Sequence, residues 1–339
     1  MVLVTGGTGF LGQHVIEELL SRGQAVRALV RRPSRILARM FPALEQVSGD
    51  VQDLASLPAA LAGARRVFHL AGLVSRDPKD ATRMMRIHVD GTRNVLRAAC
   101  EAGVDRVVLA SSSGTVAVSK DPERVLDESA PFALELVKGW PYYLSKIYQE
   151  QLALDVCGKE KLPLVIMSPS LLLGPGDARG SSTEDVRRFL QRKIPICPEG
   201  GVNFVDVRDV ATAFASAMEN GRDGERYLLG GPNWTLETFF GRLERLSKVP
   251  APRLRVPDKV ARWGAILMEQ FADWRGVAPP VDRISVEMAQ HFWYVDSSKA
   301  MAELSFEPRD PQETLMDTIR YVRRHFLGEA GQDEQVVNG

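Results

Sequence analysis

The sequence predicts an α/β protein built on a doubly wound parallel sheet, with a smaller lobe toward the C-terminus. Apolar, β-branched runs of strand length alternate with longer helical patterns, as in parallel sheets whose two faces are both covered by helices. A glycine-rich turn, TGGTGFLG, joins the first strand pattern to the first helical pattern. With 339 residues, the chain is long enough for one large α/β domain and an added lobe.

The predicted strands follow one another along the first half of the chain. A strand is expected to end just before Ser48, and the others are expected at residues 2–5, 25–30, 65–72, 106–113 and 163–170. Gly23 and Gly103 follow helical patterns and are expected to end those helices. Beyond residue 170 the alternation weakens. Pro and Gly gather at 171–182 and 194–201, which indicates loops that cross between lobes.

Composition limits the classes of function. Lys and Arg together equal Asp and Glu at 43 each, so no global charge attracts nucleic acid or an anionic membrane. The five histidines show no close ligand spacing and the three cysteines no CxxC pair, so no metal site is predicted. No apolar run reaches membrane-spanning length, and the N-terminus enters a strand at once. These features predict a cytoplasmic protein.

The turn at residues 5–12 has the composition of a phosphate-binding loop. Gly6 allows a tight turn, Gly9 lets a pyrophosphate approach the backbone, and Gly12 lets the helix pack against the strand. The N-terminus of that helix then faces the phosphates. A lone glycine triplet has little weight, but this one lies directly between a strand and a helix. It predicts a Rossmann-type dinucleotide site, to which we also assign Thr5, Phe10 and Leu11.

The end of the second strand bears on which dinucleotide binds. An acidic residue there would hold the ribose hydroxyls of NAD. This chain has Arg31 and Arg32 instead, with Arg35 close behind, and a guanidinium can bind a 2′-phosphate that a carboxylate would repel. NADP(H) is therefore the favoured cofactor and NAD(H) the alternative. Arg35 and Arg39 can equally belong to a solvated helix start.

Two lobes and a tail follow from these patterns. Residues 1–170 are predicted to form the dinucleotide-binding Rossmann lobe, to which residues 203–230 return. Residues 171–327 are predicted to form mainly the substrate-binding lobe. The polar residues 328–339 are expected to fray.

The segment PYYLSK at residues 141–146 places a tyrosine one helical turn before a lysine. Tyr142 and Lys146 share a helix face, and spacing alone does not exclude Tyr143, three residues before the lysine. A nearby ammonium favours the phenolate and lowers the pKa of a tyrosine, which brings proton transfer into range. Tyr and Lys at this spacing also recur by chance on surface helices, so the surrounding motifs must decide.

Together these motifs resemble the extended short-chain dehydrogenases/reductases, over nearly the whole chain from Val2 to about Phe326. The chain is most similar to the branch of this family that contains dihydroflavonol reductases, 3β-hydroxysteroid dehydrogenases and hopanoid-associated epimerase-like proteins. The segment VVLASSSGTV resembles the TSSAGTV of that branch, which implies Ser112 as the catalytic hydroxyl. Ser113 is the fallback, and Thr115 is an expected assistant.

The resemblance also implies further cofactor contacts, carried by the segments SGDVQD, FHLAG and VIMSPS. In the family, these segments lie at the adenine, in an Ala-Gly turn that faces the cofactor, and beside the nicotinamide. The residues implied are, in that order, Asp50 and Val51, Ala71 and Gly72, and Pro169 and Ser170. His69 within FHLAG is expected to be a packed strand residue.

The chain departs from the family pattern at two positions. His88 stands where the family commonly has Asn, which puts a proton-relay role there in doubt. Ser168 stands where many members have Arg, which removes an expected charge anchor near the site. Neither departure touches Ser112, Tyr142 or Lys146.

The predicted function is an NADP(H)-dependent oxidoreductase of the EC 1.1.1 type. In the reductive direction, Ser112 binds the carbonyl oxygen, Tyr142 donates the proton, Lys146 lowers the pKa of Tyr142, and NADPH delivers hydride. One alternative is a nucleotide-sugar epimerase or dehydratase that holds NAD tightly. A second is a non-catalytic dinucleotide-sensing protein, although such proteins typically lose the Tyr or the Lys.

Partners are predicted from aromatic content and from the resemblance. Aromatic residues at 138–143 and 287–295 suit an apolar, polycyclic or long-chain ketone or alcohol. Residues 257–274 have helical spacing; a packing role is expected, with peripheral contact at a membrane surface as the alternative. The resemblance implies a homodimer formed by helices within residues 84–99 and 143–156.

Overall fold

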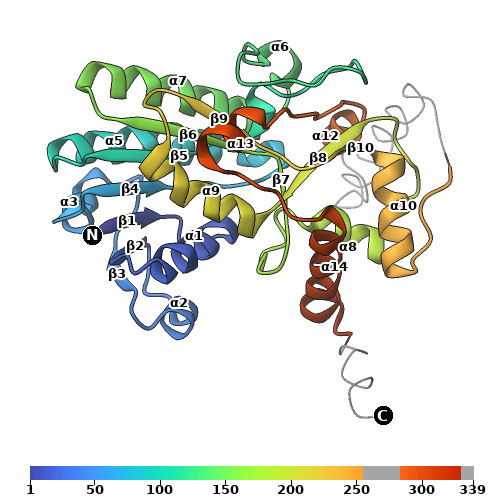
Figure 1. The fold of residues 1–339 in the computed structure, drawn as a ribbon, viewed down its shortest axis with the longest axis horizontal. Coiled ribbons are helices and arrows are strands. Elements are labelled where there is room, and N and C mark those ends of the chain that lie inside the picture. Colours follow the sequence, from blue (N-terminus) through green and yellow to red (C-terminus); the bar gives the residue numbers. More distant parts are fainter. Residues whose placement is uncertain (255–282, 330–339) are drawn as a thin grey trace.

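The structure is a computed structural model that describes residues 1–254 and 283–329. Its centre is a seven-stranded sheet in the order β3-β2-β1-β4-β5-β6-β9, and every neighbouring pair is parallel (Figure 1). The strands are β1 (Val2–Thr5), β2 (Val26–Val30), β3 (Glu45–Ser48), β4 (Arg66–His69), β5 (Arg106–Ala110), β6 (Leu164–Pro169) and β9 (Arg226–Leu229). The predicted doubly wound α/β fold is confirmed.

Helices cover both faces of this sheet (Figure 1). The core of one face contains residues of α1 (Phe10–Ser21), α2 (Arg35–Met40), α9 (Val207–Asn220) and α13 (Ser298–Leu304). The core of the other face contains residues of α3 (Leu57–Leu61), α5 (Gly91–Glu101) and α7 (Pro141–Glu160). Gly23 and Gly103 follow α1 and α5 with φ of 71° and 67°, the left-handed conformation in which a glycine ends a helix.

The helix that leads into α5 contains an irregular turn. The chain runs from the short turn η2 (Pro78–Asp80) through α4 (Ala81–Met85) into η3 (Arg86–Asp90), and then directly into α5. The segment η3 is a π turn, which winds more residues into one turn than an α-helix does. His88 lies within it and is fully buried. Such turns occur often at functional sites.

A second, smaller sheet supports the other lobe. Its order is β10 (Asn233–Thr235), β8 (Gly201–Asp206) and β7 (Leu171–Leu173). Its core includes side chains of α8 (Glu184–Leu190), α10 (Leu236–Ser247) and α14 (Pro311–Val322). The remaining elements are η1 (Leu54–Ser56), η4 (Ser113–Thr115), α6 (Leu134–Val137), α12 (Arg283–Met288) and η5 (Arg323–Leu327).

The lobes exchange segments more than the sequence suggested. Helix α9 and strand β9 rejoin the main lobe, within the expected range 203–230. The range 171–327, expected to form mainly the second lobe, also contributes Ala300, Leu304 and Phe306 to the main core beside α9. The predicted helix at 257–274 and most of the tail lie outside the described residues. No helix within residues 1–254 and 283–329 is long and apolar enough to cross a membrane.

Candidate active site

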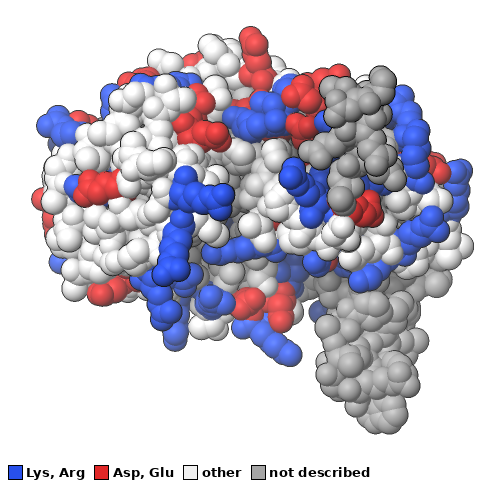
Figure 2. All heavy atoms as spheres, turned by 90° about the horizontal axis from the view of Figure 1, so that it is seen from below, with Lys and Arg blue, Asp and Glu red and all other residues white. Residues whose placement is uncertain are grey.

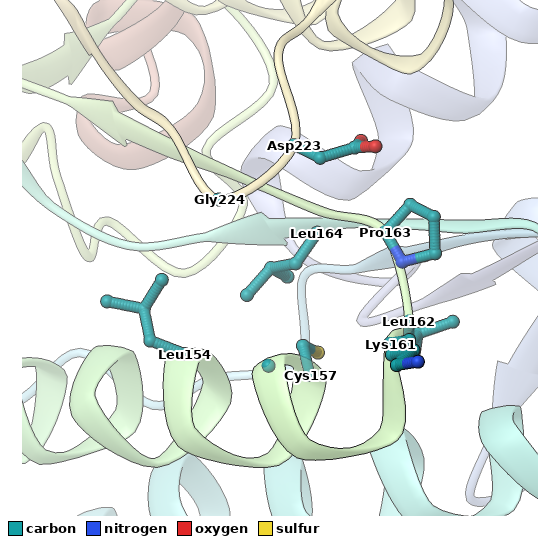
Figure 3. Close-up of a pocket in the computed structure, with 9 residues that line it drawn as sticks. Leu154, Cys157, Lys161, Leu162, Pro163, Leu164, Asp223 and Gly224 are labelled. Carbon is teal, nitrogen blue, oxygen red and sulfur yellow. The ribbon is translucent and has the colours of Figure 1, made fainter.

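The candidate residues gather where the strands of the main sheet end. The strand order reverses direction at β1, so that β2 and β3 lie on one side of it and β4 to β6 on the other. Ligands of such sheets bind outside the carboxyl ends of the strands at this switch point. Figure 3 shows a pocket at the opposite edge, lined by Leu154 of α7, by Leu164 at the start of β6 and by Gly224 ahead of β9. That pocket is therefore separate from the candidate site.

The glycine-rich turn has the shape that a dinucleotide phosphate needs. Gly6 has a φ of 73°, and a Cβ on Gly12 would lie 2.2 Å from the carbonyl oxygen of Gly6. Side chains are thus excluded where the turn folds onto the helix. Helix α1 begins at Phe10 after Gly9, and no side chain caps it. Its first backbone amides, including that of Leu11, are the kind of donor that binds phosphate.

Thr5 and the turn after β4 support the glycine-rich loop through hydrogen bonds. The Thr5 hydroxyl is fully buried, lies 2.7 Å from Nδ1 of His69 and accepts a hydrogen bond from the Ala71 amide at 3.2 Å. Thr5 therefore supports the loop through its side chain rather than facing a ligand. Gly72 is exposed, and a Cβ there would lie 3.1 Å from Nε2 of His88 and 3.9 Å from Nζ of Lys146.

Two exposed arginines follow β2 at the same edge. Within the described part of the chain, neither Arg31 nor Arg32 forms an ion pair, and Figure 2 shows basic side chains gathered on the side of the molecule where α2 lies. Asp50 is half-buried, and its Oδ1 accepts from the Gln52 amide at 3.0 Å. The Val51 side chain is buried in the core against Gly91. Only the backbone of Val51 can therefore face a ligand.

The three serines after β5 have different surroundings. Ser111 is buried and donates to the Glu150 carboxylate, and Ser113 is buried inside η4. Ser112 is half-buried, and its hydroxyl lies near enough to Tyr142 to lower the pKa of that tyrosine. The Thr115 hydroxyl donates to the Ser112 carbonyl oxygen at 2.9 Å, which leaves it supporting the turn. Of the three serines, the structure brings only Ser112 to the tyrosine.

Helix α7 carries the tyrosine and the lysine. It begins with Pro141 at its first position, where the missing N–H costs no hydrogen bond. Lys146 follows Tyr142 by one turn and is 5% exposed. Its Nζ donates to the Ala110 carbonyl oxygen at the end of β5 over 2.9 Å. The ammonium is thus anchored at the strand end that precedes the serines.

The electrostatics of this pair differ from the expectation. Burial raises the pKa of Tyr142, the neighbouring Tyr143 raises it further, and the hydrogen bond from Ser112 opposes both. Lys146 is not among these causes, so the expected lowering of the Tyr142 pKa by the lysine stays a prediction. Burial lowers the pKa of Lys146 to about 8, against the attraction of Glu150. The site therefore holds a protonated phenol beside a lysine that titrates near neutral pH.

Tyr143 points into an aromatic cluster. Its ring centroid lies 4.9 Å from Trp293, 5.0 Å from Tyr142 and 6.2 Å from Trp140. A Cβ on Gly114 would lie 2.3 Å from the Tyr143 ring, so these rings pack directly against the turn after β5. Burial raises the pKa of Tyr143 to about 12. The cluster forms an apolar wall beside Tyr142.

His88 links the loop after β4 to the start of α7. The Leu73 amide donates to Nε2 of His88 at 3.0 Å, so we assign the ring proton to Nδ1, which donates to the Ser145 hydroxyl at 2.8 Å. Ser145 in turn donates to the carbonyl oxygen of Tyr142 at 2.7 Å. Burial and the positive charge of Lys146 hold the pKa of His88 well below its usual value. His88 therefore acts as a neutral bridge in this structure.

A buried ion pair joins strand β9 to helix α7. Arg226, on the neighbouring strand β9, donates from Nε to Oε2 of the buried Glu150 at 2.8 Å. This arginine does not take the place of a residue at position 168, because Arg226 pairs with Ile166 in the sheet and Ser168 pairs with Leu228. The hydroxyls of Ser168 and Ser170 are buried without a partner in the described structure. Ser170 follows Pro169 at the end of β6, so its free hydroxyl suits a polar ligand group there.

Three residues of the site were missed from sequence. Gln149 and Glu150 lie three and four residues after Lys146, a spacing that places them on its helix face and could have marked them. Arg226 comes from a distant strand and had no such signal. Within the described residues, no group of three or more His, Cys, Asp or Glu side chains is arranged to hold a metal ion.

Comparison with known proteins agrees with this geometry. Residues 2–230 match the model of the NAD dependent epimerase/dehydratase family. The chain belongs to this family. Residues 2–230 span the main sheet from β1 to β9, including the glycine-rich turn and helix α7.

Relatives in this family match nearly the full length of the chain. A Synechocystis protein named "Putative dihydroflavonol 4-reductase" is 35% identical over 95% of this chain and 94% of its own. Sterol demethylase protein B of Methylococcus capsulatus is 32% identical over 96% and 99%. Among solved structures, gox2253 superposes with a TM-score of 0.83 at 33% identity, covering 96% of this chain and 98% of its own. The predicted resemblance to extended short-chain dehydrogenases/reductases is confirmed.

Proposed function

We propose that the protein reduces the carbonyl group of an apolar small molecule, with NADPH as the hydride source. The observation that carries this proposal is the approach of the Ser112 hydroxyl to Tyr142, near enough to lower the Tyr142 pKa, one helical turn from the buried Lys146. Two neighbouring hydroxyls can bind one substrate oxygen between them. The similarity to a protein named as a dihydroflavonol reductase supports the reductive direction.

The proton needed for reduction comes from Tyr142. When bound, the nicotinamide supplies hydride to the carbonyl carbon. Ser112 donates a hydrogen bond to the carbonyl oxygen, and Tyr142 transfers its proton to that oxygen as negative charge develops there. The raised pKa keeps Tyr142 protonated at neutral pH, as a proton donor requires. Lys146, charged below pH about 8, stabilises the phenolate left behind.

Replacing each of the adjacent tyrosines tests these roles. Tyr142→Phe removes the proton donor and is expected to lower kcat by at least about a hundredfold, with NADPH affinity nearly intact. Tyr143→Phe is the matched control. It keeps the ring that packs on Trp293 and is expected to retain most of the turnover. Loss of turnover in Tyr143→Phe but not in Tyr142→Phe would overturn the assignment.

The residues at the carboxyl edge fit a dinucleotide. Hydrogen-bond donors lie along one edge of the sheet, namely the uncapped backbone amides at the start of α1 and the unpartnered hydroxyl of Ser170. The turn admits no Cβ at Gly12, so no side chain fills it there. Arg31 and Arg32 would hold a 2′-phosphate, which favours NADP(H) over NAD(H). Asp50, at the end of the next strand, would face the adenine.

Calorimetry on NADPH and NADH tests the cofactor preference. A charge-assisted hydrogen bond contributes roughly 1.5–3 kcal/mol, so Arg31→Asp is expected to weaken NADPH binding by about ten- to a hundredfold and NADH binding little. Arg39→Asp makes the same change of charge on an exposed residue of α2 and serves as the control. Equal affinity of the wild type for both dinucleotides, unaffected by Arg31→Asp, would contradict the preference.

The aromatic cluster beside Tyr142 supports an apolar, ring-containing substrate. Tyr143 and Trp293, both half-buried, offer flat apolar surface next to the reacting hydroxyls, and the buried Trp140 packs against both rings. The similarity to a sterol demethylase protein agrees with that chemistry. We expect NADPH oxidation with sterol ketones or aromatic carbonyl compounds. Conversion of UDP-sugars without net NADPH oxidation would instead establish an epimerase.

A further inference from the structure

Lys146 is held by two hydrogen bonds of different kinds. Its Nζ donates to the Ala110 carbonyl oxygen and to Oε1 of Gln149, both over 2.9 Å. The first acceptor is fixed by the sheet, whereas the second is a side chain on the same helix as the lysine. Because an ammonium can only donate, the Gln149 amide must turn its oxygen toward Lys146 and its nitrogen away.

The nitrogen of that amide is anchored in turn. Gln149 is fully buried, and its Nε2 donates to the Thr92 hydroxyl at 2.8 Å. Thr92 also lies 2.9 Å from Nε2 of His69, whose Nδ1 contacts Thr5. The Thr5 hydroxyl accepts from the Ala71 amide. A buried chain of hydrogen bonds thus runs from α7 through α5 and β4 to the start of the glycine-rich turn.

We propose that Gln149 is a positioning residue that sets where the Lys146 ammonium lies relative to Tyr142 and the dinucleotide turn. This inference rests on the function proposed above for Lys146. The ammonium sits on a flexible four-carbon stem, so a single bond to Ala110 would leave its direction free. The chain through Thr92 removes that freedom and ties the lysine to the loop that receives the phosphates.

An amide suits this role better than a carboxylate does. It accepts a hydrogen bond from the ammonium without adding a negative charge, which would hold the lysine proton more firmly. A carboxylate is available one residue later, but Ser111 and Arg226 occupy both oxygens of Glu150. Burial lowers the pKa of Lys146 to about 8, and the charge of Glu150 opposes that shift.

Two variants of Gln149 test the proposal, with an exposed glutamine of the same helix as the control. Gln149→Met removes the acceptor at similar volume, and Gln149→Glu replaces it with a charged one. Gln151→Met changes a solvent-exposed residue two positions on. The readouts are kcat, NADPH affinity, the melting temperature, and an NMR titration of 13C-labelled lysine in which Lys146→Arg identifies the Lys146 signal.

The proposal predicts that the two Gln149 variants shift the Lys146 pKa in opposite directions. Gln149→Met should lower kcat by about ten- to a hundredfold, with NADPH affinity within about twofold of the wild type. It should also lower the Lys146 pKa below its value of about 8. Gln149→Glu should raise that pKa by about one unit or more. Gln151→Met should leave every readout as in the wild type.

An unchanged Lys146 titration in both Gln149 variants would overturn the proposal, even if the melting temperature fell, because a purely structural amide predicts that pattern. Where these variants do not fold, Thr92 provides the second test. Thr92→Val should reproduce the effect of Gln149→Met, and Thr92→Ser, which keeps the hydroxyl, should restore the wild-type values. The same Lys146 pKa in Thr92→Val and Thr92→Ser would overturn the proposal. The titration needs no turnover, so it still decides the question if no NADPH-dependent reduction is found.

Discussion

Removing the Arg226 guanidinium tests how much this group stabilises the folded protein by pairing with the buried Glu150 carboxylate. Glu150 is fully buried on α7, and the Arg226 side chain on β9 is 13% exposed. Nε and Nη2 of Arg226 both donate to Oε2, and Ser111 donates to Oε1. Breaking a buried ion pair by removing one partner costs about 3–5 kcal/mol. Because Ser111 still serves one oxygen, we expect Arg226→Met to lower the unfolding free energy by about 3 kcal/mol.

Urea denaturation measures this loss as a shift of the midpoint at constant slope. Arg65→Met is the matched control, since Arg65 and its partner Asp105 are 70% and 48% exposed and their pair is worth at most about 1 kcal/mol. Combining Arg226→Met with Glu150→Gln removes the uncompensated charge and should recover more than half of the loss. A loss for Arg226→Met no larger than that of the control would refute the reasoning.

Three further outcomes follow from the geometry of the site. The kcat of reduction should fall as pH rises through about 8, where Lys146 loses its charge, and a pH profile from 6 to 10 checks this. Because the pKa of His88 is lowered in the folded protein, the unfolded chain binds more protons below pH 6.5 and the unfolding free energy falls there as pH falls. His88→Asn should make that fall shallower by up to about 1.4 kcal/mol per pH unit, measured by urea denaturation at several pH values. Gly12→Ala should abolish NADPH binding in calorimetry, because its Cβ would lie 2.2 Å from the Gly6 carbonyl oxygen. Gly139→Ala, whose Cβ would meet nothing within 4 Å, should bind normally.

The main sheet was predictable because most of its strands are buried on both faces. Strands such as β1 and β6 therefore carry unbroken apolar runs. Strand β3, at the sheet edge, reads EQVS and contains no fully buried residue, so no apolar run marks it. The second sheet was not predicted, because β7 and β10 have three residues each and lie among loop-like sequence. Such short strands are specified by their partners rather than by local pattern.

The site was predictable as far as local spacing reaches. Tyr142 and Lys146 share a helix face, and the glycine spacing gives the turn after β1. The direction of the Tyr142 pKa shift was not predictable, because it depends mainly on burial, which only the folded chain decides. The contacts of Gln149 with Thr92, and of Glu150 with Arg226, join residues 57 and 76 positions apart. Only the folded chain brings such pairs together.

The π turn at Arg86–Asp90 constrains insertions and deletions in this part of the chain. Deleting one residue there would remove the π turn and change the orientation of the preceding helix relative to α5. His88 and Thr92 would then no longer face Ser145 and Gln149 together. A segment grafted from a relative must therefore match residues 81–101 in length as well as in sequence. Loop lengths elsewhere on the surface carry no comparable restriction.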